Sequence, residues 1–275
     1  MARFVLVHGA FGGAWFWEPV VGELEAAGHT VEAIDLPGSG ADIAPASEAT
    51  LEHYAERICE TLRRGERAIL VGHSMGGVAI TQAAARCRDA ISLLVFVAAF
   101  MPADGQSLID LTRLPEGAGD GVQANITIGG DPPAATLSDE AWRTVILPNC
   151  TDEQVAWALA RGRPQPLAPF TTPVSIPDGA LDGVWRTYVY CSGDLAIPPA
   201  LQRRMIRENP CVDVVEIATD HSPQFSATKE LAAALERFVA FAGAPGTPSA
   251  AGAGGGNAPR RGDGLRAKVR SLLGR

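Results

Sequence analysis

The chain has 275 residues, of which 47% are hydrophobic and 20% are charged, and its formal net charge at pH 7 is −8. This composition can bury one sizeable core, so a wholly disordered chain is excluded. Residues 243–275 hold six Lys and Arg against one Asp, which leaves a net charge of −13 on residues 1–242. Nucleic-acid affinity comes chiefly from basic groups that neutralise phosphates, so this acidic body argues against a nucleic-acid partner.

Short apolar runs alternate with helical patterns along most of the chain. In chain order, the pattern predicts strand 4–7, helix 17–27, strand 30–35, helix 51–64, strand 67–71, helix 75–86, strand 91–98, strand 187–191, helix 199–208, strand 212–217 and helix 229–241. The run at 91–98 is nearly all apolar, which is typical of a strand buried on both faces of a parallel sheet. The alternation predicts an α/β fold with a mostly parallel sheet flanked by helices.

The alternation breaks between about residue 103 and residue 184. Two helical patches, at 138–146 and 152–161, interrupt a proline-rich stretch there. A structureless loop of this length is uncommon inside a compact domain, so we expect an inserted cap over the carboxyl edge of the sheet, where open α/β sheets place their active sites. Residues 1–242 are thus predicted to form one domain, and residues 243–275 a flexible Gly/Ala/Pro-rich linker with a basic tail.

The five cysteines are scattered, with no CxxC pair and no Cys/His cluster at the spacing of zinc ligands. The sequence therefore indicates neither a disulfide framework nor a structural metal. The apolar stretch at the N-terminus is too short for a signal peptide, and no run of about 18 apolar residues occurs. We expect a cytoplasmic protein with no membrane span, and the sequence does not define its oligomeric state.

Residues 72–76 read Gly-His-Ser-Met-Gly, which is the pattern G-x-S-x-G between a predicted strand and an Ala-rich helix. This strand–turn–helix context is the one in which a nucleophile elbow occurs. The flanking glycines allow the backbone to turn sharply enough to hold the hydroxyl of Ser74 clear of the sheet. Ser74 is therefore the predicted nucleophile, and the neighbouring His73 is expected to be buried beneath the turn.

A serine hydroxyl becomes a good nucleophile only when a base removes its proton. In folds with this elbow the partners follow in the order Ser, acid, His, and His221 is the only histidine after Ser74. The acid must lie between them at the carboxyl end of a strand, which is where Asp194 stands. Asp182 is the alternative acid. Asp220 is assigned to the surface, because neighbouring side chains rarely meet in the geometry that the base requires.

Acyl transfer also requires hydrogen-bond donors for the developing oxyanion. The amide of Met75, directly after the nucleophile, is one predicted donor. The second is expected in the glycine-rich loop at residues 8–13, where we favour the amide of Ala10 over that of Phe11. The chain has no dinucleotide fingerprint, Walker A sequence or HExxH zinc motif. Neither a cofactor nor a metal ion is therefore predicted.

Several segments together resemble a known superfamily. They are FVLVHGAFGGAWFW at residues 4–17, the AAGH turn and IDLPGSG loop within residues 22–40, GHSMGG at residues 72–77, and the GDxxIPP and DHS segments that contain Asp194 and His221. These motifs resemble the α/β-hydrolase superfamily, and within it the branch of methylesterases, hydroxynitrile lyases and related bacterial carboxylesterases. The likeness covers residues 1–242. It implies Ser74 as nucleophile, Asp194 as acid and His221 as base, with the amides of Ala10 and Met75 as the oxyanion hole.

One position departs from the lyases of this branch, which typically place a Lys directly after the catalytic His. Here that residue is Ser222, and Lys229 is the only Lys in residues 1–242. We therefore predict a serine carboxylesterase that hydrolyses small neutral or hydrophobic carboxylic esters through an acyl-enzyme, its partner being a small-molecule ester. Two alternatives stay open: a lyase or other cofactor-free reaction on the same residues, and a ligand-binding receptor on a hydrolase fold.

Overall fold

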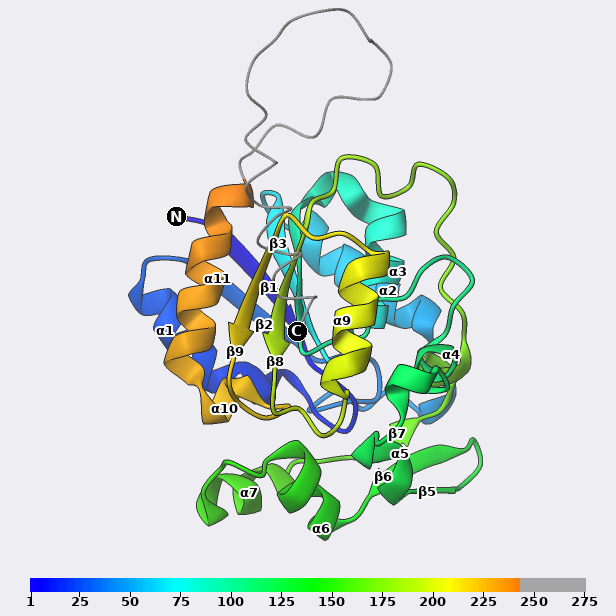
Figure 1. Ribbon diagram of the computed structural model, residues 1–275. Coiled ribbons are helices and arrows are strands. Elements are labelled where there is room, and N and C mark those ends of the chain that lie inside the picture. The colour runs from blue at the N-terminus through cyan, green and yellow to red at the C-terminus, as the bar shows by residue number, and fades with distance from the viewer. Residues whose placement is uncertain (243–275) are drawn as a thin grey trace, which may run out of the picture.

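Six strands form one parallel sheet at the centre of the computed structural model, which describes residues 1–242 (Figure 1). The sheet has the order β2–β1–β3–β4–β8–β9, with β1 (Arg3–Val7), β2 (Thr30–Ile34), β3 (Ala68–His73), β4 (Ile91–Val97), β8 (Arg186–Cys191) and β9 (Asp213–Ile217). The chain runs from β1 outward to β2 and then crosses back to β3 on the other side of β1. The carboxyl ends of β1 and β3 therefore flank a topological switch point, the place where open α/β sheets bind ligands.

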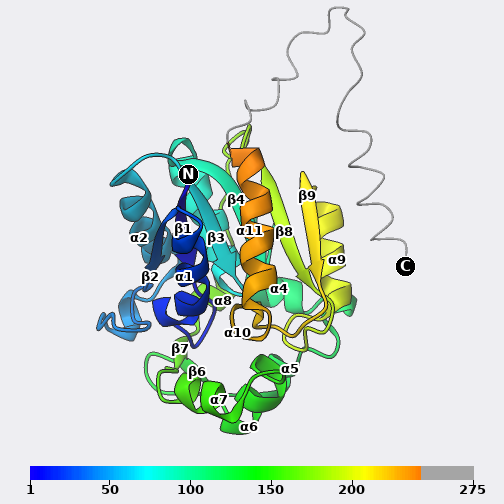
Figure 2. The same cartoon turned by 90° about the vertical axis from the view of Figure 1, so that its left-hand side faces the viewer.

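Helices cover both faces of this sheet, as Figures 1 and 2 show. On one face α1 (Glu18–Ala26) lies beside α11 (Thr228–Ala242), and their core includes the buried Phe4 and Trp17. The opposite face carries α2 (Leu51–Arg63), α3 (Gly76–Cys87) and α9 (Pro199–Glu208), packed around a second core that includes Tyr54 and Phe96. The sheet is thus buried on both sides, which explains the continuous apolar run of its central strands.

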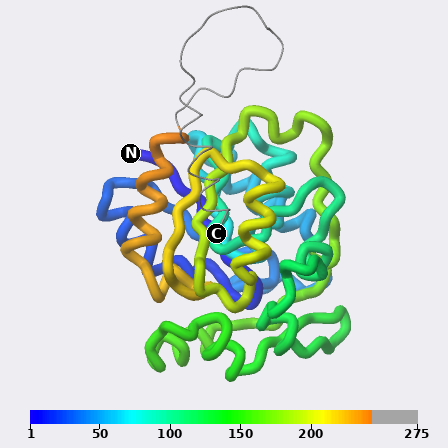
Figure 3. The backbone as a smooth tube through the Cα atoms, in the orientation of Figure 1, coloured from blue at the N-terminus to red at the C-terminus, as the bar shows by residue number. Residues whose placement is uncertain are grey.

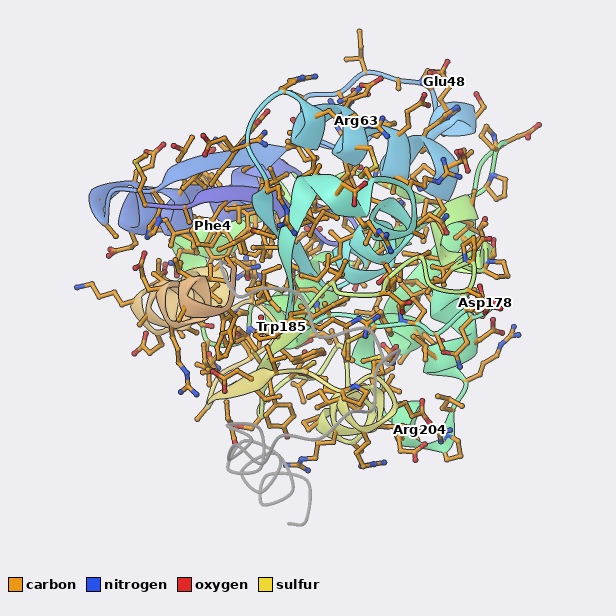
Figure 4. The ribbon with its side chains drawn as sticks, turned by 90° about the horizontal axis from the view of Figure 1, so that it is seen from above. Phe4, Glu48, Arg63, Asp178, Trp185 and Arg204 are labelled. Atoms are coloured by element: carbon orange, nitrogen blue, oxygen red, sulfur yellow. A yellow bond between two sulfur atoms is a disulfide. The ribbon has the colours of Figure 1, made fainter. Side chains whose placement is uncertain are left out.

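The labelled side chains in the view from above show the same layering (Figure 4). The charged residues Glu48, Arg63 and Asp178 lie at the periphery, whereas Trp185 lies further in, next to α11. Its ring packs against that of Phe241 at a centroid distance of 6.2 Å. The α/β fold with a parallel sheet between helices is therefore confirmed.

Local signals in the sequence explain where individual helices begin and end. The hydroxyl of Thr50 caps α2 by accepting a hydrogen bond from the amide of His53 at 3.2 Å. α1 ends just before Gly28, whose φ angle of +89° lies in the region that glycine adopts without strain. Since both signals can be read from the sequence, the predicted bounds of these helices differ from the observed ones by no more than a residue.

Much of the segment between β4 and β8 forms a layer below the carboxyl edge of the main sheet, and its last part returns along the side of the molecule to the start of β8 (Figures 1 and 3). We call residues 103–184 the cap segment. It contains α4 (Leu108–Thr112), α5 (Gly121–Asn125), β5 (Ile126–Gly129), β6 (Ala134–Leu137), α6 (Asp139–Ala141), a π-helical turn (Trp142–Ile146), α7 (Asp152–Leu159), β7 (Gln165–Pro166) and α8 (Ala168–Thr171). The small antiparallel sheet β5–β6–β7 was not predicted, because its strands have only two to four residues, too few for an alternating apolar pattern to be recognised.

The cysteines correct one expectation from the sequence. Cys59 of α2 and Cys87 of α3 form a disulfide, with their Cα atoms 5.8 Å apart. Their separation of 28 residues carries no recognisable motif, since the pairing arises only when α2 packs along α3. No helix within residues 1–242 combines the length and apolarity that crossing a membrane requires. The predicted linker and basic tail at 243–275 lie outside the described residues.

Candidate active site

The predicted nucleophile, Ser74, lies in a sharp turn between β3 and α3. Its φ angle is +54°, in the left-handed region that residues with a side chain rarely adopt. Hydrogen bonds hold the turn, because the Ser74 carbonyl accepts from the amides of Gly77 at 3.0 Å and Phe100 at 3.1 Å. The Ser74 amide donates to the carbonyl of Val97 at 3.3 Å. The strained turn is thus fixed by its neighbours, as in a nucleophile elbow.

The loop after β1 packs directly against this turn, because two glycines leave room for the close approach. A Cβ atom added at Gly9 would lie 2.7 Å from the Cβ of Ser74. One added at Gly76 would lie 2.6 Å from the carbonyl oxygen of His8. Both distances are shorter than carbon and oxygen atoms tolerate in a packed interior. The glycine pattern therefore brings the first loop and the elbow into contact.

The predicted base, His221, and the predicted acid, Asp194, form a hydrogen bond with each other. His221 lies in the loop between β9 and α10 (Pro223–Ser226), and Asp194 lies in the loop after β8. The His221 Nδ1 atom is 2.9 Å from Oδ2 of Asp194, and the two residues are only 2% and 1% exposed. With its Nδ1 proton donated to the carboxylate, His221 keeps Nε2 as an acceptor. This is the tautomer that a general base needs.

The carboxylate of Asp194 is fixed from two further directions. Its Oδ1 accepts hydrogen bonds from the amides of Ala196 and Ile197, each at 2.8 Å. Its Oδ2 also accepts from Nε2 of the fully buried Gln202, which α9 supplies, at 3.0 Å. Gln202 was not predicted, because a glutamine within a helix pattern carries no signal that it faces inward. These bonds hold the carboxylate in its position beside His221.

Asp220 corrects a second expectation, since it is completely buried rather than at the surface. Its Oδ1 accepts from the Ser222 amide at 2.9 Å and the Ser226 hydroxyl at 2.7 Å. Its Oδ2 accepts from the amide of Asn149, in the cap segment, at 3.0 Å. The position next to His221 does prevent a bond to that ring, but the loop folds inward and the carboxylate satisfies buried amides instead.

A second hydrogen bond joins the same loop to the cap segment. The hydroxyl of Ser222, which is also fully buried, donates to the carbonyl of Ile146 at 2.6 Å. The residues on both sides of His221 are therefore each bonded to the backbone of the cap segment. We call these two bonds, Asp220 to Asn149 and Ser222 to Ile146, the cap tie.

His73 is buried beneath the elbow, as predicted, with 3% exposure. Its Nε2 lies 2.8 Å from the carbonyl oxygen of His221, so it donates to the backbone of the predicted base. The ring stacks on Phe16 at a centroid distance of 5.3 Å. Burial holds the pKa of His73 well below its usual range, with the nearby His221 adding to this effect. A neutral His73 therefore supports the loop that carries His221.

The pKa of His221 is raised, although its burial acts in the opposite direction. The facing Asp194 carboxylate outweighs the burial through its charge and its hydrogen bond. Asp220 and Asp120 add to the increase through their charges. An imidazolium at this position is thus stabilised by three carboxylates, which favours the protonated intermediate of a base-catalysed reaction.

The two predicted oxyanion donors flank Ser74. Ala10 lies in the loop after β1, and Met75 directly follows Ser74 at the start of α3. Both residues line the pocket that contains Ser74 and His221. Within residues 1–242 neither amide has an acceptor in the protein. The amide of Phe11 is likewise without one, so the choice of Ala10 stays a prediction.

The pocket above Ser74 lies between the main sheet and the cap segment, and it is lined mainly by apolar side chains. These are Phe11, Phe16, Phe100, Leu108, Ile109, Val122, Ile126, Trp142, Ile146 and Phe170. Asp182, the alternative acid, is exposed in a turn before β8, and the carboxylate bonded to His221 is that of Asp194. The structure thus brings Ser74, His221, Asp194 and both predicted donors to one place.

Comparison with known proteins agrees with this geometry. The alpha/beta hydrolase family matches residues 4–234, which is most of the chain. This chain belongs to the α/β hydrolase family. Methylesterase 7 of Arabidopsis thaliana is 34% identical to it over 252 residues, covering 85% of this chain and 94% of that protein. Putative methylesterase 13, chloroplastic, of the same plant is 34% identical over 240 residues. That alignment covers 83% of this α/β hydrolase but only 54% of the relative's length.

Solved structures extend the agreement to three dimensions. The crystal structure of polyneuridine aldehyde esterase superimposes with a TM-score of 0.79 and 26% sequence identity, covering 87% of this α/β hydrolase and 99% of that chain. Together with the near full-length match to Methylesterase 7, this places the chain among the ester hydrolases.

The charged residue of this pocket was not predicted from the sequence of this α/β hydrolase. Asp120 lies at the start of α5 and lines the same pocket as Ser74, with only 8% exposure. Its position in the sequence suggested no role, because the cap segment has no regular pattern from which a side chain's direction could be inferred. The only available signal was an Asp before a short helical stretch, which is typical of an ordinary helix cap.

Proposed function

We propose that this α/β hydrolase is a serine carboxylesterase that uses Ser74 as nucleophile, His221 as base and Asp194 as acid. The observation that carries the proposal is the position of His221. Its Nδ1 is bonded to a buried carboxylate, while the ring lines the pocket that also contains Ser74. A histidine oriented in this way can take a proton from a serine hydroxyl and return it to a leaving group.

The reaction proceeds in two halves. His221 Nε2 removes the hydroxyl proton as Ser74 Oγ attacks the ester carbonyl, and the amides of Ala10 and Met75 donate to the resulting oxyanion. The tetrahedral intermediate collapses with cleavage of the ester C–O bond, and His221 gives its proton to the departing alcohol. Water, deprotonated by His221, then attacks the acyl-enzyme, which releases the carboxylic acid and restores the Ser74 hydroxyl.

The lining of the pocket supports esters with apolar acyl or alcohol groups, because aliphatic and aromatic side chains dominate it. Methyl esters are the first substrates to test, given the name of Methylesterase 7. Ser222 counts against the lyase alternative, since its buried hydroxyl bonds to the Ile146 carbonyl and provides no cation beside His221. Lys229, the only lysine within residues 1–242, is exposed on α11.

The experiment is fluorophosphonate labelling combined with hydrolysis of a p-nitrophenyl ester series. The wild type should be labelled at Ser74 and should hydrolyse short esters. Ser74→Ala should lose both properties, and His221→Ala should lose several orders of magnitude in rate while its circular dichroism stays unchanged. Unchanged turnover in Ser74→Ala would overturn the mechanism, and a folded wild type without labelling or turnover would favour the receptor alternative.

A further inference from the structure

The carboxylate of Asp120 is the starting point of a further inference. Three buried carboxylates act on His221, namely those of Asp194, Asp220 and Asp120, and all three contribute to its raised pKa. Only Asp120 lines the pocket that contains Ser74. It therefore differs from the other two in facing the space that a substrate would occupy.

The hydrogen bonds of the three carboxylates also differ. Both oxygens of Asp194 and of Asp220 accept at least one bond of 3.0 Å or shorter from a donor of the protein. At Asp120, Oδ1 accepts from the amides of Val122 at 2.8 Å and Gln123 at 3.0 Å. Its Oδ2 accepts only from the Gln123 side chain, at 3.3 Å. Asp120 Oδ2 is thus the carboxylate oxygen with the most acceptor capacity left for a ligand.

The position of Asp120 is fixed rather than variable. The neighbouring Gly121 donates its amide to the carbonyl of Leu195, in the same loop as Asp194, at 2.9 Å. A Cβ atom at Gly121 would lie 2.9 Å from both that carbonyl oxygen and the side chain of Val145. Because this part of the cap segment is packed between the Asp194 loop and the side chain of Val145, the carboxylate is held at one place in the pocket.

The surroundings of Asp120 favour a positively charged ligand. The pKa of Asp120 is raised by burial, and the bonds from Gln123 and Val122 and the charge of His221 offset this only in part, so a cation bound at Oδ2 would favour the ionised carboxylate. An ionised carboxylate in a largely apolar pocket is costly unless a donor or a cation meets it. Trp142 and Phe170 line the same pocket, and aromatic faces attract cations with weak hydration shells, such as alkylammonium groups.

We propose that Asp120 determines specificity by binding a positively charged ammonium group, so that the preferred substrates are apolar esters that carry such a group. The proposal rests on the proposed esterase function and narrows its substrate class. Asp120 takes no part in bond making: it binds the part of the substrate that faces the cap segment, while Ser74 and His221 perform the hydrolysis.

The test uses two inhibitors of nearly identical shape, choline and its uncharged isostere 3,3-dimethylbutan-1-ol, against hydrolysis of neutral p-nitrophenyl acetate. The variants are Asp120→Asn and Asp120→Ser, since Asn and Ser both preserve a helix cap. Asp110→Asn is the matched control. Asp110 also accepts a hydrogen bond at a helix start, from the amide of the N-cap residue Ser107 at 2.9 Å, but it is exposed and does not line the pocket.

The wild type and Asp110→Asn should bind choline at least about tenfold more tightly than the isostere. In both Asp120 variants the ratio should fall to about one, and it is measured at each variant's own rate on the neutral ester, because loss of the Asp120 charge also lowers the pKa of His221. A ratio near one in the wild type, or an unchanged ratio in the variants, would overturn the proposal. Calorimetric titration of the same two compounds gives the ratio of their affinities without any turnover. Failure of the proposed esterase function is detected separately, by comparing the wild type with Ser74→Ala.

Discussion

Replacing Asp220 by Asn tests whether this residue is a structural carboxylate or the acid of the reaction. An Asn side chain retains one oxygen, which can still accept from Ser222 and Ser226. Its NH2 group would then face the amide of Asn149, where Asp220 Oδ2 now accepts at 3.0 Å. Two donors would meet in a buried position, so the bond to the cap segment is lost.

The expected cost follows from that one bond. Loss of a hydrogen bond to a charged group costs about 1.5–3 kcal/mol. For a chain of this size each kcal/mol lowers the melting temperature by about 2–4 °C, so the melting temperature of Asp220→Asn should fall by about 3–12 °C. Activity at neutral pH should change far less, since the bond between His221 and Asp194 is untouched. The pKa of His221 should fall, because Asp220 is one of the charges that raise it.

The assay combines thermal unfolding by circular dichroism with kcat/KM on a neutral p-nitrophenyl ester. Asp182→Asn is the control, because Asp182 is exposed, and it should leave both quantities unchanged. Asp194→Asn should lower kcat by about 10⁴-fold, the loss expected when the base is held in the wrong tautomer. If Asp220→Asn melted like the wild type but lost activity to the same degree, Asp220 would be the acid and the reasoning from burial would be refuted.

Three further predictions concern the base, the disulfide and the first loop. The rate should fall with decreasing pH through a pKa above about 6.5, because Asp194 raises the pKa of His221 and the protonated ring cannot accept a proton. An acidic limb of kcat/KM centred below that value would contradict this prediction. Replacing both Cys59 and Cys87 by Ala should lower the free energy of unfolding by about 2–4 kcal/mol. Reductant should lower the melting temperature of the wild type but not that of this variant. A wild type that melts identically with and without reductant would show that the two thiols are not paired. Gly9→Ala should destabilise the protein by about 1–3 kcal/mol and reduce kcat, since the new methyl group would lie 2.7 Å from Ser74; a fully active, equally stable variant would show that the loop can move away.

The elements that the sequence predicted well are those with strong local signals. Helix α9 has the predicted bounds, and the strands of the main sheet differ from prediction by at most two residues. The common position of Ser74 and His221 in one pocket could be predicted because a motif marks the first and elimination leaves only the second. Both inferences depend on chain order and residue type, which do not require knowledge of packing.

The features that the sequence did not predict arise from contacts between distant segments. Cys59 and Cys87 pair only because α2 lies along α3, and Gln202 reaches Asp194 only because α9 packs behind β8. Asp220 was assigned to the surface because it adjoins His221 in the chain, yet its charge is accommodated by donors that include an amide 71 residues away. Satisfaction of a buried polar group depends on such partners, and a single residue's identity does not reveal them.

The cap tie has a consequence for the route by which a substrate enters. Since the cap segment is bonded on both sides of His221, swinging that end outward would pull the base away from Ser74 and break two buried hydrogen bonds. The opposite end, the hairpin of β5 and β6, is more exposed and has no such connection to the base. A displacement of this hairpin would leave both bonds of the cap tie intact, so one part of the segment holds the base while another part, at Ile126, lines the pocket.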